Sequence, residues 1–206
     1  MKMKALMGAV LMLGLAACNS GGGLNIGQGF NIDANLTGAS VRTAITQVVD
    51  STTGAVKRYE STYTLTQPNA IFNVGPQSVG MTLQGFTVEV LDNAGTRYGD
   101  DQGKYQRSVS YVVQPGFICS TAGTTLDNCA PSAKVASKVA TTIGSLPLVT
   151  DRIAALIVND CETTGCPTLK LKVTFSGTDD AGRAQTLTVV SADLASSVSS
   201  FSTIKE

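Results

Sequence analysis

The sequence predicts an all-β fold, an antiparallel sandwich with loop insertions. Two observations predict it. From about residue 30, apolar and polar residues alternate with a period of two, and Val, Thr, Ile and Tyr dominate the alternating segments. Short polar clusters that begin with Asp and end with Gly separate these segments. Several short strands at this spacing are typical of a two-layer β protein.

The clearest strand is predicted over 169–176, where Leu169, Leu171, Val173 and Phe175 fall on one face. A second segment, 86–90, has the same alternation. Weaker patterns predict further strands over 41–49, 57–65, 107–114, 152–158 and 185–191. The stretches 132–140 and 192–198 have apolar residues four apart, which leaves a short helical turn open as an alternative.

Three turn clusters lie over 50–54, 92–95 and 179–182. Each begins with Asp and contains Gly at its end. An Asp side chain accepts hydrogen bonds from backbone N–H groups of the turn, and Gly tolerates a positive φ. We therefore expect tight turns between strands at all three places.

The chain begins with a separate pattern that predicts export. Lys2 and Lys4 precede an apolar stretch over 5–14, which is too short to span a bilayer as a helix. Residues 15–18, Leu-Ala-Ala-Cys, resemble the lipobox of bacterial lipoproteins position for position. The resemblance implies that residues 1–17 are removed, and that Cys18 carries a diacylglycerol thioether and an acylated amine.

The next residues, 18–29, are rich in Gly and are predicted to form a flexible tether before a sandwich domain over 30–206. In the Gram-negative sorting rule, Asp after the lipidated Cys retains a lipoprotein in the inner membrane. Here that residue is Asn19. The resemblance therefore implies a cell-envelope protein that is anchored by lipid in the outer membrane.

The segment 172–183 resembles the closing hairpin of bacterial Ig-like and fibronectin type III-like domains, with a strand, an Asp and a turn Gly. This resemblance covers a short part of the chain. The body exceeds the ~100 residues of an ordinary Ig domain. We expect one elaborated Ig-like sandwich with insertions near 115–148.

Four cysteines remain in the body, Cys119, Cys129, Cys161 and Cys166. Export favours their oxidation. Four cysteines allow three connectivities, and the local pairs Cys119–Cys129 and Cys161–Cys166 fit best because loop-like residues separate each pair. A four-thiolate zinc site is a weaker alternative, since zinc knuckles use closer spacings than these.

Composition excludes several kinds of chemistry. The chain contains no His and no Trp, so His-dependent triads and His-ligated metal sites are excluded. Loss of Lys2 and Lys4 with residues 1–17 leaves thirteen basic against fifteen acidic residues, a net charge of −2. A balance this near neutrality, without a basic block, argues against a nucleic-acid partner.

No motif points to catalysis. Ser202 and Lys205 form a Ser-x-x-Lys motif near the end of the chain, and Ser137 and Lys138 are adjacent. The candidate acid pairs, all in turn-like segments, are Asp100 with Asp101, Asp160 with Glu162, and Asp179 with Asp180. We expect no cofactor and no catalytic residues. The four oxygen-bearing residues Asp92, Asn93, Asp100 and Asp101 leave a structural calcium ion open.

The sequence thus predicts a non-catalytic binding or structural module, held to the membrane by its N-terminal lipid, that docks to another envelope protein or surface component. Tyr59 and Tyr63, four apart on one predicted strand face with Ser61 and Leu65, are candidates for a binding patch. Two alternatives stay open. The first is an envelope hydrolase with a Lys or carboxylate base, and the second is a periplasmic ligand carrier built as a closed barrel.

Overall fold

The computed structural model describes residues 29–206, except for the side chain of Ala192. This part of the chain is an antiparallel β-sandwich with one α-helix, which confirms the predicted fold class. The predicted signal peptide, Cys18 and the tether up to residue 28 lie outside the described residues. Within 29–206, no helix has both the length and the apolar character needed to span a bilayer.

The strands form three sheets. The first has the order β1-β4-β9, and its strands are β1 (Ile32–Thr37), β4 (Asn69–Val74) and β9 (Val139–Ile143). The second has the order β3-β2-β11-β10-β5-β6. Its strands are β2 (Ser40–Val49), β3 (Val56–Thr66), β5 (Met81–Leu91), β6 (Lys104–Val113), β10 (Leu169–Asp179) and β11 (Ala184–Lys205). The third pairs β7 (Phe117–Cys119) with β8 (Lys134–Ala136).

The first sheet packs against β10 and β5 of the second, and the core lies between them. Phe72 of β4 meets Phe175 of β10 edge-on, with ring centroids 5.1 Å apart. Phe86 of β5 meets the same ring at 6.2 Å. All three rings are buried. One aromatic cluster therefore joins both layers of the sandwich.

Two of the strand pairs are halves of one long hairpin. β1 runs into β2 across Gly38 and Ala39, and β3 runs into β4 across Gln67 and Pro68. Both pairs are antiparallel, so residues 32–74 fold back on themselves around the turn at 50–54. Proline has no N–H for a ladder, which is consistent with the break at Pro68. The base of the hairpin lies in the first sheet and its tip lies in the second.

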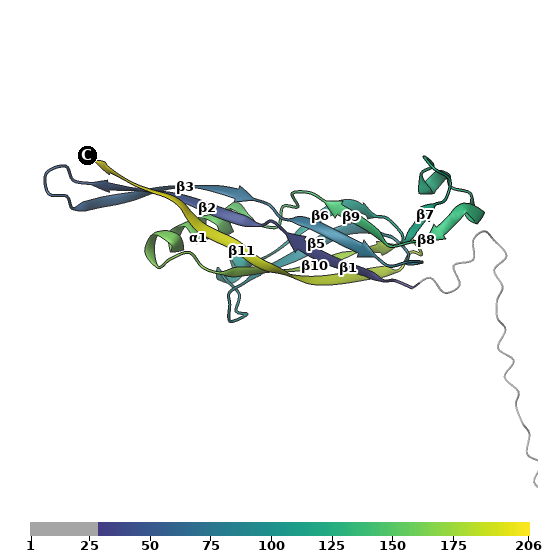
Figure 1. Ribbon diagram of the computed structural model, residues 1–206. Helices are drawn as coiled ribbons and strands as arrows, with labels where there is room; N and C mark the ends of the chain where they lie inside the picture. The colour runs from purple at the N-terminus through teal and green to yellow at the C-terminus, as the bar shows by residue number, and fades with distance from the viewer. Residues whose placement is uncertain (1–28) are drawn as a thin grey trace, which may run out of the picture.

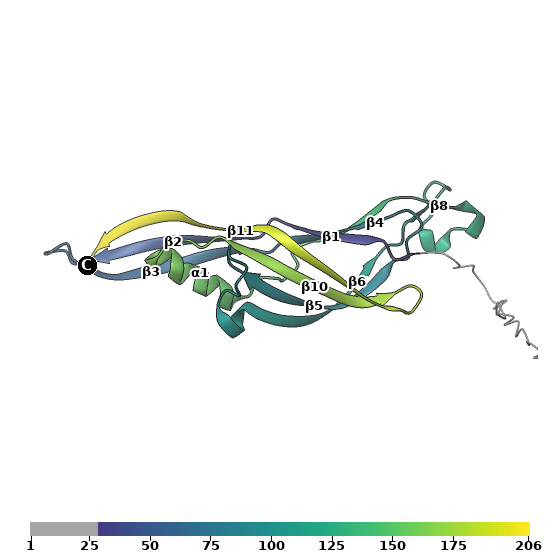
Figure 2. The same ribbon diagram turned by 90° about the horizontal axis from the view of Figure 1, so that it is seen from below.

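The longest strand, β11, connects the sandwich to this tip. Its first half pairs with β10 in antiparallel fashion as far as Leu194. Its second half, from Ala195 to Lys205, pairs with β2, and this ladder is the one parallel ladder among the described strands. We call the three-stranded region made of β2, β3 and residues 195–205 the arm. Figures 1 and 2 show the arm projecting from one end of an elongated molecule, opposite the end at which the described chain begins.

The three predicted turns are present with the expected chemistry. Asp50 Oδ1 accepts hydrogen bonds from the N–H groups of Thr52 and Thr53 at 2.9 and 2.8 Å. Asp92 and Asp179 make equivalent bonds within their own turns. The closing glycines all have a positive φ: Gly54 at 71°, Gly95 at 79° and Gly182 at 79°.

These turns predict an acid-sensitive fold. The N–H groups of Thr53 and Thr52, with Lys57, lower the pKa of Asp50 from 3.8 to about 2. Hydrogen bonds from Arg183 and Gln185 outweigh burial and lower the pKa of Asp179 as well. A carboxyl whose pKa falls on folding stabilises the fold above its unfolded pKa and loses that contribution as the pH falls through its folded pKa.

We therefore expect the melting temperature to fall as the pH is lowered from 3.8 towards 2. The double variant Asp50→Asn with Asp179→Asn should melt lower than the natural chain at neutral pH and show a smaller change across this window. Thermal melts followed by circular dichroism at several pH values measure both effects. If the melting temperatures of the two proteins changed identically with pH, Asp50 and Asp179 would not be the source of the acid sensitivity.

The predicted strand over 152–158 is wrong, because this segment belongs to helix α1 (Asp151–Thr163). Its buried residues are Ile153, Ala154, Ile157 and Cys161, which share one face at helical spacing. Thr150 caps the helix, since its hydroxyl accepts a hydrogen bond from the N–H of Ile153 at 3.3 Å. An apolar run of this length fits a strand or a helix, and the cap decides for the helix.

The stretches 132–140 and 192–198, for which a helical turn was an open alternative, are both mainly extended. Residues 134–136 form β8 and residues 139–143 form β9, after a 3₁₀ turn, η3 (Pro131–Ala133). Residues 192–198 continue β11. The insertion expected near 115–148 is correct for β7, η2 (Leu126–Asn128) and β8, which lie beyond the end of the sandwich in Figure 1. It is wrong for β9, which completes the first sheet.

Candidate interaction surface

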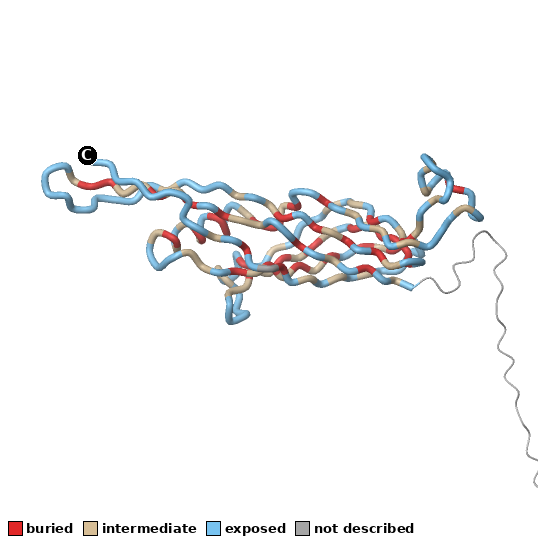
Figure 3. The backbone as a smooth tube through the Cα atoms, viewed as in Figure 1, coloured by how far each residue is buried: buried red, intermediate tan, exposed pale blue. Residues whose placement is uncertain are grey.

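The arm carries most of the exposed apolar side chains. Ten large apolar residues are exposed among the described residues, and six of them lie on the arm. Those six are Val56, Tyr59, Tyr63, Val198, Phe201 and Ile204. The other four are spread over β6, β7, β8 and the first half of β11. In Figure 3 the arm is exposed over most of its length, whereas the sandwich is buried along its centre.

The strand register places three of these residues on the same face of the arm. Residues directly opposite one another in a ladder share a face, and so do alternate residues of one strand. Three alternate residues of β2 lie opposite exposed apolar residues of β3. The opposed pairs are Val49 with Val56, Gln47 with Tyr59, and Thr43 with Tyr63.

The second ladder adds two more to this face. Phe201 of β11 lies opposite Ile45, and Val198 lies opposite Thr43. Ile45 and Thr43 lie on the same face of β2 as Gln47 and Val49. We call this surface the arm face and define it by its five exposed apolar residues: Val56, Tyr59, Tyr63, Val198 and Phe201. Phe201 is 59% exposed and Tyr59 is 44% exposed, while Ile45 between them is 4% exposed.

The opposite face of the arm is polar. Thr46 and Ser202 exchange a hydrogen bond across it at 3.0 Å. Arg58 pairs there with Glu60 at 2.8 Å. Ile204, beside Val48, is the exposed apolar residue on that side. Its other members include Arg42, Ala44, Thr62, Thr64, Ser197 and Ser200. The arm is therefore amphipathic: on its apolar side most of the β2 residues are buried, whereas the five flanking residues of β3 and β11 are exposed.

Helix α1 begins at the base of the arm face. The hydroxyl of Tyr63 donates to the Asp151 carboxylate in the first turn of α1, at 3.4 Å. Partial burial and the nearby negative charge of Asp151 raise the pKa of Tyr63, so its hydroxyl stays protonated. Just before the helix, Gln67 makes two hydrogen bonds to the backbone of Val149, at 2.7 and 3.0 Å. The helix thus lies against the base of the arm face, at Tyr63.

Polar groups cross the arm face between its apolar residues. The Gln47 amide lies between the Tyr59 hydroxyl and the Thr203 hydroxyl, at 3.4 Å from each. Thr43 Oγ1 and Ser61 Oγ are the buried side-chain polar atoms without a hydrogen-bond partner among the described residues. Both residues lie on the arm face. Unpaired buried hydroxyls are rare in native proteins.

The structure contains both locally paired disulfides. Cys119–Cys129 joins β7 to the end of η2, with Cα atoms 5.7 Å apart. Cys161–Cys166 ties the last turns of α1 to the loop before β10. The first therefore joins two elements of the insertion beyond the end of the sandwich, β7 and η2. The second secures a helix end where the sequence predicted a loop between strands. This pairing excludes a four-thiolate zinc site.

The five tyrosines do not form one patch, and Tyr111 lies apart on β6, partly buried against the core. Tyr59 and Tyr63 share the arm face, as the alternation predicted. Tyr98 is half-buried beside α1, where its hydroxyl donates to Asp160 at 2.7 Å, and burial with that carboxylate raises its pKa. Burial also raises the pKa of Tyr105, whose hydroxyl donates to the Leu148 carbonyl.

Two of the candidate catalytic pairs are separated or engaged in other hydrogen bonds. Ser202 lies on the polar face of the arm, whereas Lys205 lies opposite Val49 in the other set. Asp179 accepts hydrogen bonds from Arg183 and Gln185 within its turn. The partner of Asp180 is the N–H of Gly80, which donates to it at 2.8 Å.

The calcium alternative gains no support. Asp92 uses Oδ1 within its own turn, bonding the N–H groups of Ala94 and Thr96. Asp100 and Asp101 form the start of the 3₁₀ helix η1 (Asp100–Gly103). No group of three or more Asp, Glu or Cys residues within 29–206 comes together in a way that could hold a metal ion.

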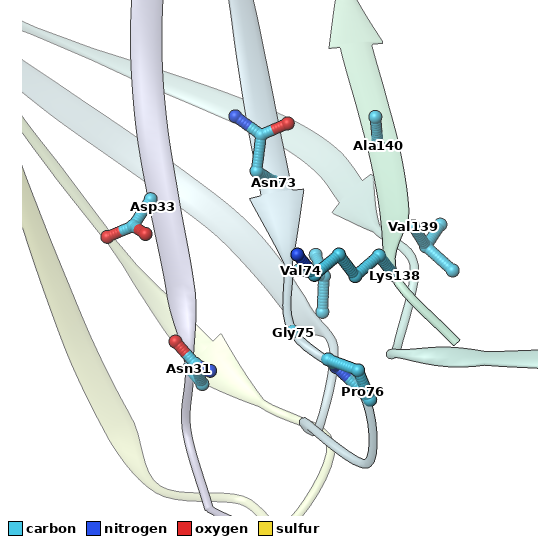
Figure 4. A pocket seen from close by; sticks show the side chains of 9 residues that line it. All are labelled: Asn31, Asp33, Asn73, Val74, Gly75, Pro76, Lys138, Val139 and Ala140. Atoms are coloured by element: carbon cyan, nitrogen blue, oxygen red, sulfur yellow. The ribbon is translucent and has the colours of Figure 1, made fainter. Parts of the chain in front are cut away.

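One open hollow of about 470 Å³ lies on the outer side of the first sheet, shown in Figure 4. Asp33 of β1 and Lys138 stand at its sides and form no ion pair in the described structure. Its other lining residues are Asn31, Asn73, Val74, Gly75, Pro76, Val139 and Ala140. It brings together none of the candidate catalytic residues.

Comparison with known protein families finds none that matches this chain, and no curated protein is significantly similar to it. The arm holds six of the ten exposed large apolar residues, which makes it the strongest functional feature of the described residues. Sequence reasoning found its β3 half through the tyrosines but missed its β11 half. The available signal was Val198, Phe201 and Ile204 within a Ser-rich stretch.

Proposed function

We propose that this chain is a lipid-anchored module of the bacterial cell envelope that docks, without catalysing a reaction, to another envelope protein. The arm face carries this proposal. Soluble proteins rarely leave contiguous apolar surface exposed unless it binds something. Aromatic side chains at the centre of such a surface are the residue types that contribute most to protein–protein binding.

The shape of the molecule supports the proposal. The proposed anchor, Cys18, precedes Gly29 by a short Gly-rich segment. The described chain begins at one end of the elongated body, and the arm lies at the other. The extended run 32–49 alone would reach about 60 Å at ~3.3 Å per residue. An anchored molecule would thus hold its apolar face well away from the lipid surface, where another protein can reach it.

The anchor predicts a covalent modification. We expect metabolic labelling with a palmitate analogue to mark the natural chain, because two or three acyl chains hold a lipoprotein stably in a membrane. Cys18→Ser should lose the label, and Ser20→Ala should keep it. Mass spectrometry of the N-terminal peptide locates the lipid. A label that persists in Cys18→Ser would contradict lipidation at this residue.

Docking predicts a stoichiometric companion. The tagged chain would be extracted from its own membranes in mild detergent and purified without denaturation. We expect one envelope protein to elute with it in a fixed ratio. Elution of the chain alone, as a monomer, at every detergent concentration tested would contradict the proposal.

A further inference from the structure

The second half of β11 has an unpaired edge. Up to Leu194, β11 pairs with β10 on one side, and its ladder with β2 on the other side begins only at Ala195. From Ala195 onwards it pairs with β2 alone, and no described strand lies on the other side. Every residue from Ser197 to Lys205 is exposed. An open edge of this kind presents a row of free backbone donors and acceptors to an incoming chain.

The backbone groups on this edge can be assigned. The N–H of Glu206 donates to the carbonyl of Val49, on the β2 side, at 2.9 Å. Successive residues of a strand direct their backbone groups alternately to its two sides. The N–H groups of Phe201, Thr203 and Lys205 therefore point to the open edge.

The edge lacks the usual protection against strand pairing. Free edges of natural sheets are blunted by charged residues or proline. Lys57, Arg58 and Glu60 lie on β3, which is the other edge of the arm. In β11, by contrast, no charged residue and no proline occurs between Leu194 and Ile204. Apart from Lys205 at its end, this edge is neutral, which favours a neutral strand as its partner.

The position of such a strand already exists in the fold. β10 begins opposite Leu194, with Leu169, in antiparallel register. Pro167, just before β10, is not part of the sheet. Its carbonyl accepts a hydrogen bond from the Ser196 hydroxyl. An added antiparallel strand would continue the line of β10 beside residues 197–205. Its side chains on the arm face would pack next to Phe201 and Val198.

We propose that the second half of β11 accepts a β-strand from the envelope partner, neutral in charge and apolar at alternate positions. The inference rests on the docking function proposed above and specifies how the partner binds. Backbone hydrogen bonds would supply affinity, and the side chains beside Phe201 would supply specificity.

A second copy of this chain fits the edge less well. Two β11 edges related by a two-fold axis perpendicular to the sheet would form one continuous sheet. Both arm faces would then lie on the same side of that sheet. The exposed apolar surface would double instead of being covered, so we assign the strand to a different protein.

The test uses a photoreactive side chain in living cells. Phe201 is replaced by p-benzoylphenylalanine in the full lipidated chain, and irradiation is followed by mass spectrometry of the adduct. We expect one discrete adduct with a different envelope protein. Adding Thr203→Pro should reduce its yield about tenfold or more, because proline removes an N–H on the open edge and spares the β2 ladder. Thr203→Ala is the matched control and should keep the yield.

A second proline variant guards against misfolding. Lys205→Pro acts on the same edge at the end of the strand, and it should also reduce the adduct without lowering the melting temperature. An adduct that both prolines leave unchanged, but that Tyr59→Ser removes, would overturn the strand-addition inference and leave docking through the arm face intact. An adduct with a second copy of this chain would also overturn the inference. Absence of any adduct from Phe201 would count against docking through the arm altogether.

Discussion

Replacing Tyr59 and Phe201 together by serine is expected to weaken partner binding about 100-fold or more while the fold stays intact. Tyr59 is 44% exposed and Phe201 is 59% exposed, so the free protein loses little packing when they are removed. In a complex they would be buried at the centre of the arm face, on either side of β2. The affinity of the purified partner for each protein, by titration calorimetry or interferometry, gives the fold-change.

The chain offers a matched control for this variant. Val112 is 59% exposed and Val190 is 52% exposed, and both lie outside the arm. Replacing them together by serine removes a similar number of exposed apolar side chains and should leave binding unchanged. Equal losses in the two double variants would mean that the partner does not select the arm face.

Replacing Phe175 by alanine is expected to destabilise the fold by about 3–5 kcal/mol. Its ring is fully buried, and it contacts both Phe72 of the first sheet and Phe86 of the second. Removing it leaves a cavity between the layers and ends two edge-on aromatic contacts at once. Urea unfolding followed by circular dichroism measures the free energy of unfolding.

Phe201→Ala is the control for size and residue type. It removes the same ring from an exposed position, so we expect a change within about 0.5 kcal/mol. The two phenylalanines lie in neighbouring strands of the same sheet, β10 and β11. Comparable losses from Phe175→Ala and Phe201→Ala would contradict both the position of the core and the exposure of the arm.

The strands that were predictable are those with one buried face. In 169–176 the core selects every second residue, so the alternation is complete and the strand is unambiguous. The Asp-to-Gly turns were equally predictable because their hydrogen bonds are local. The local disulfides followed from sequence spacing for the same reason.

Helix α1 and the arm could not be predicted from the alternation of apolar and polar residues. Residues 152–158 are apolar at nearly every position, so a strand and a helix fit equally well until Thr150 is seen to cap the segment. All residues of 195–205 except Ser196 are exposed, so this segment shows little alternation. Their pairing with β2 is parallel and joins residues about 155 positions apart, beyond any local signal.

The most direct test of docking through the arm compares amide hydrogen exchange in the free protein and in the native complex purified from membranes. Our account predicts slower exchange in the complex over residues 56–66 and 195–205, with little change over β5, β6 and β7. Protection that falls on the hollow between β1 and β9, or on the outer face of β5 and β6, with none on the arm, would contradict it.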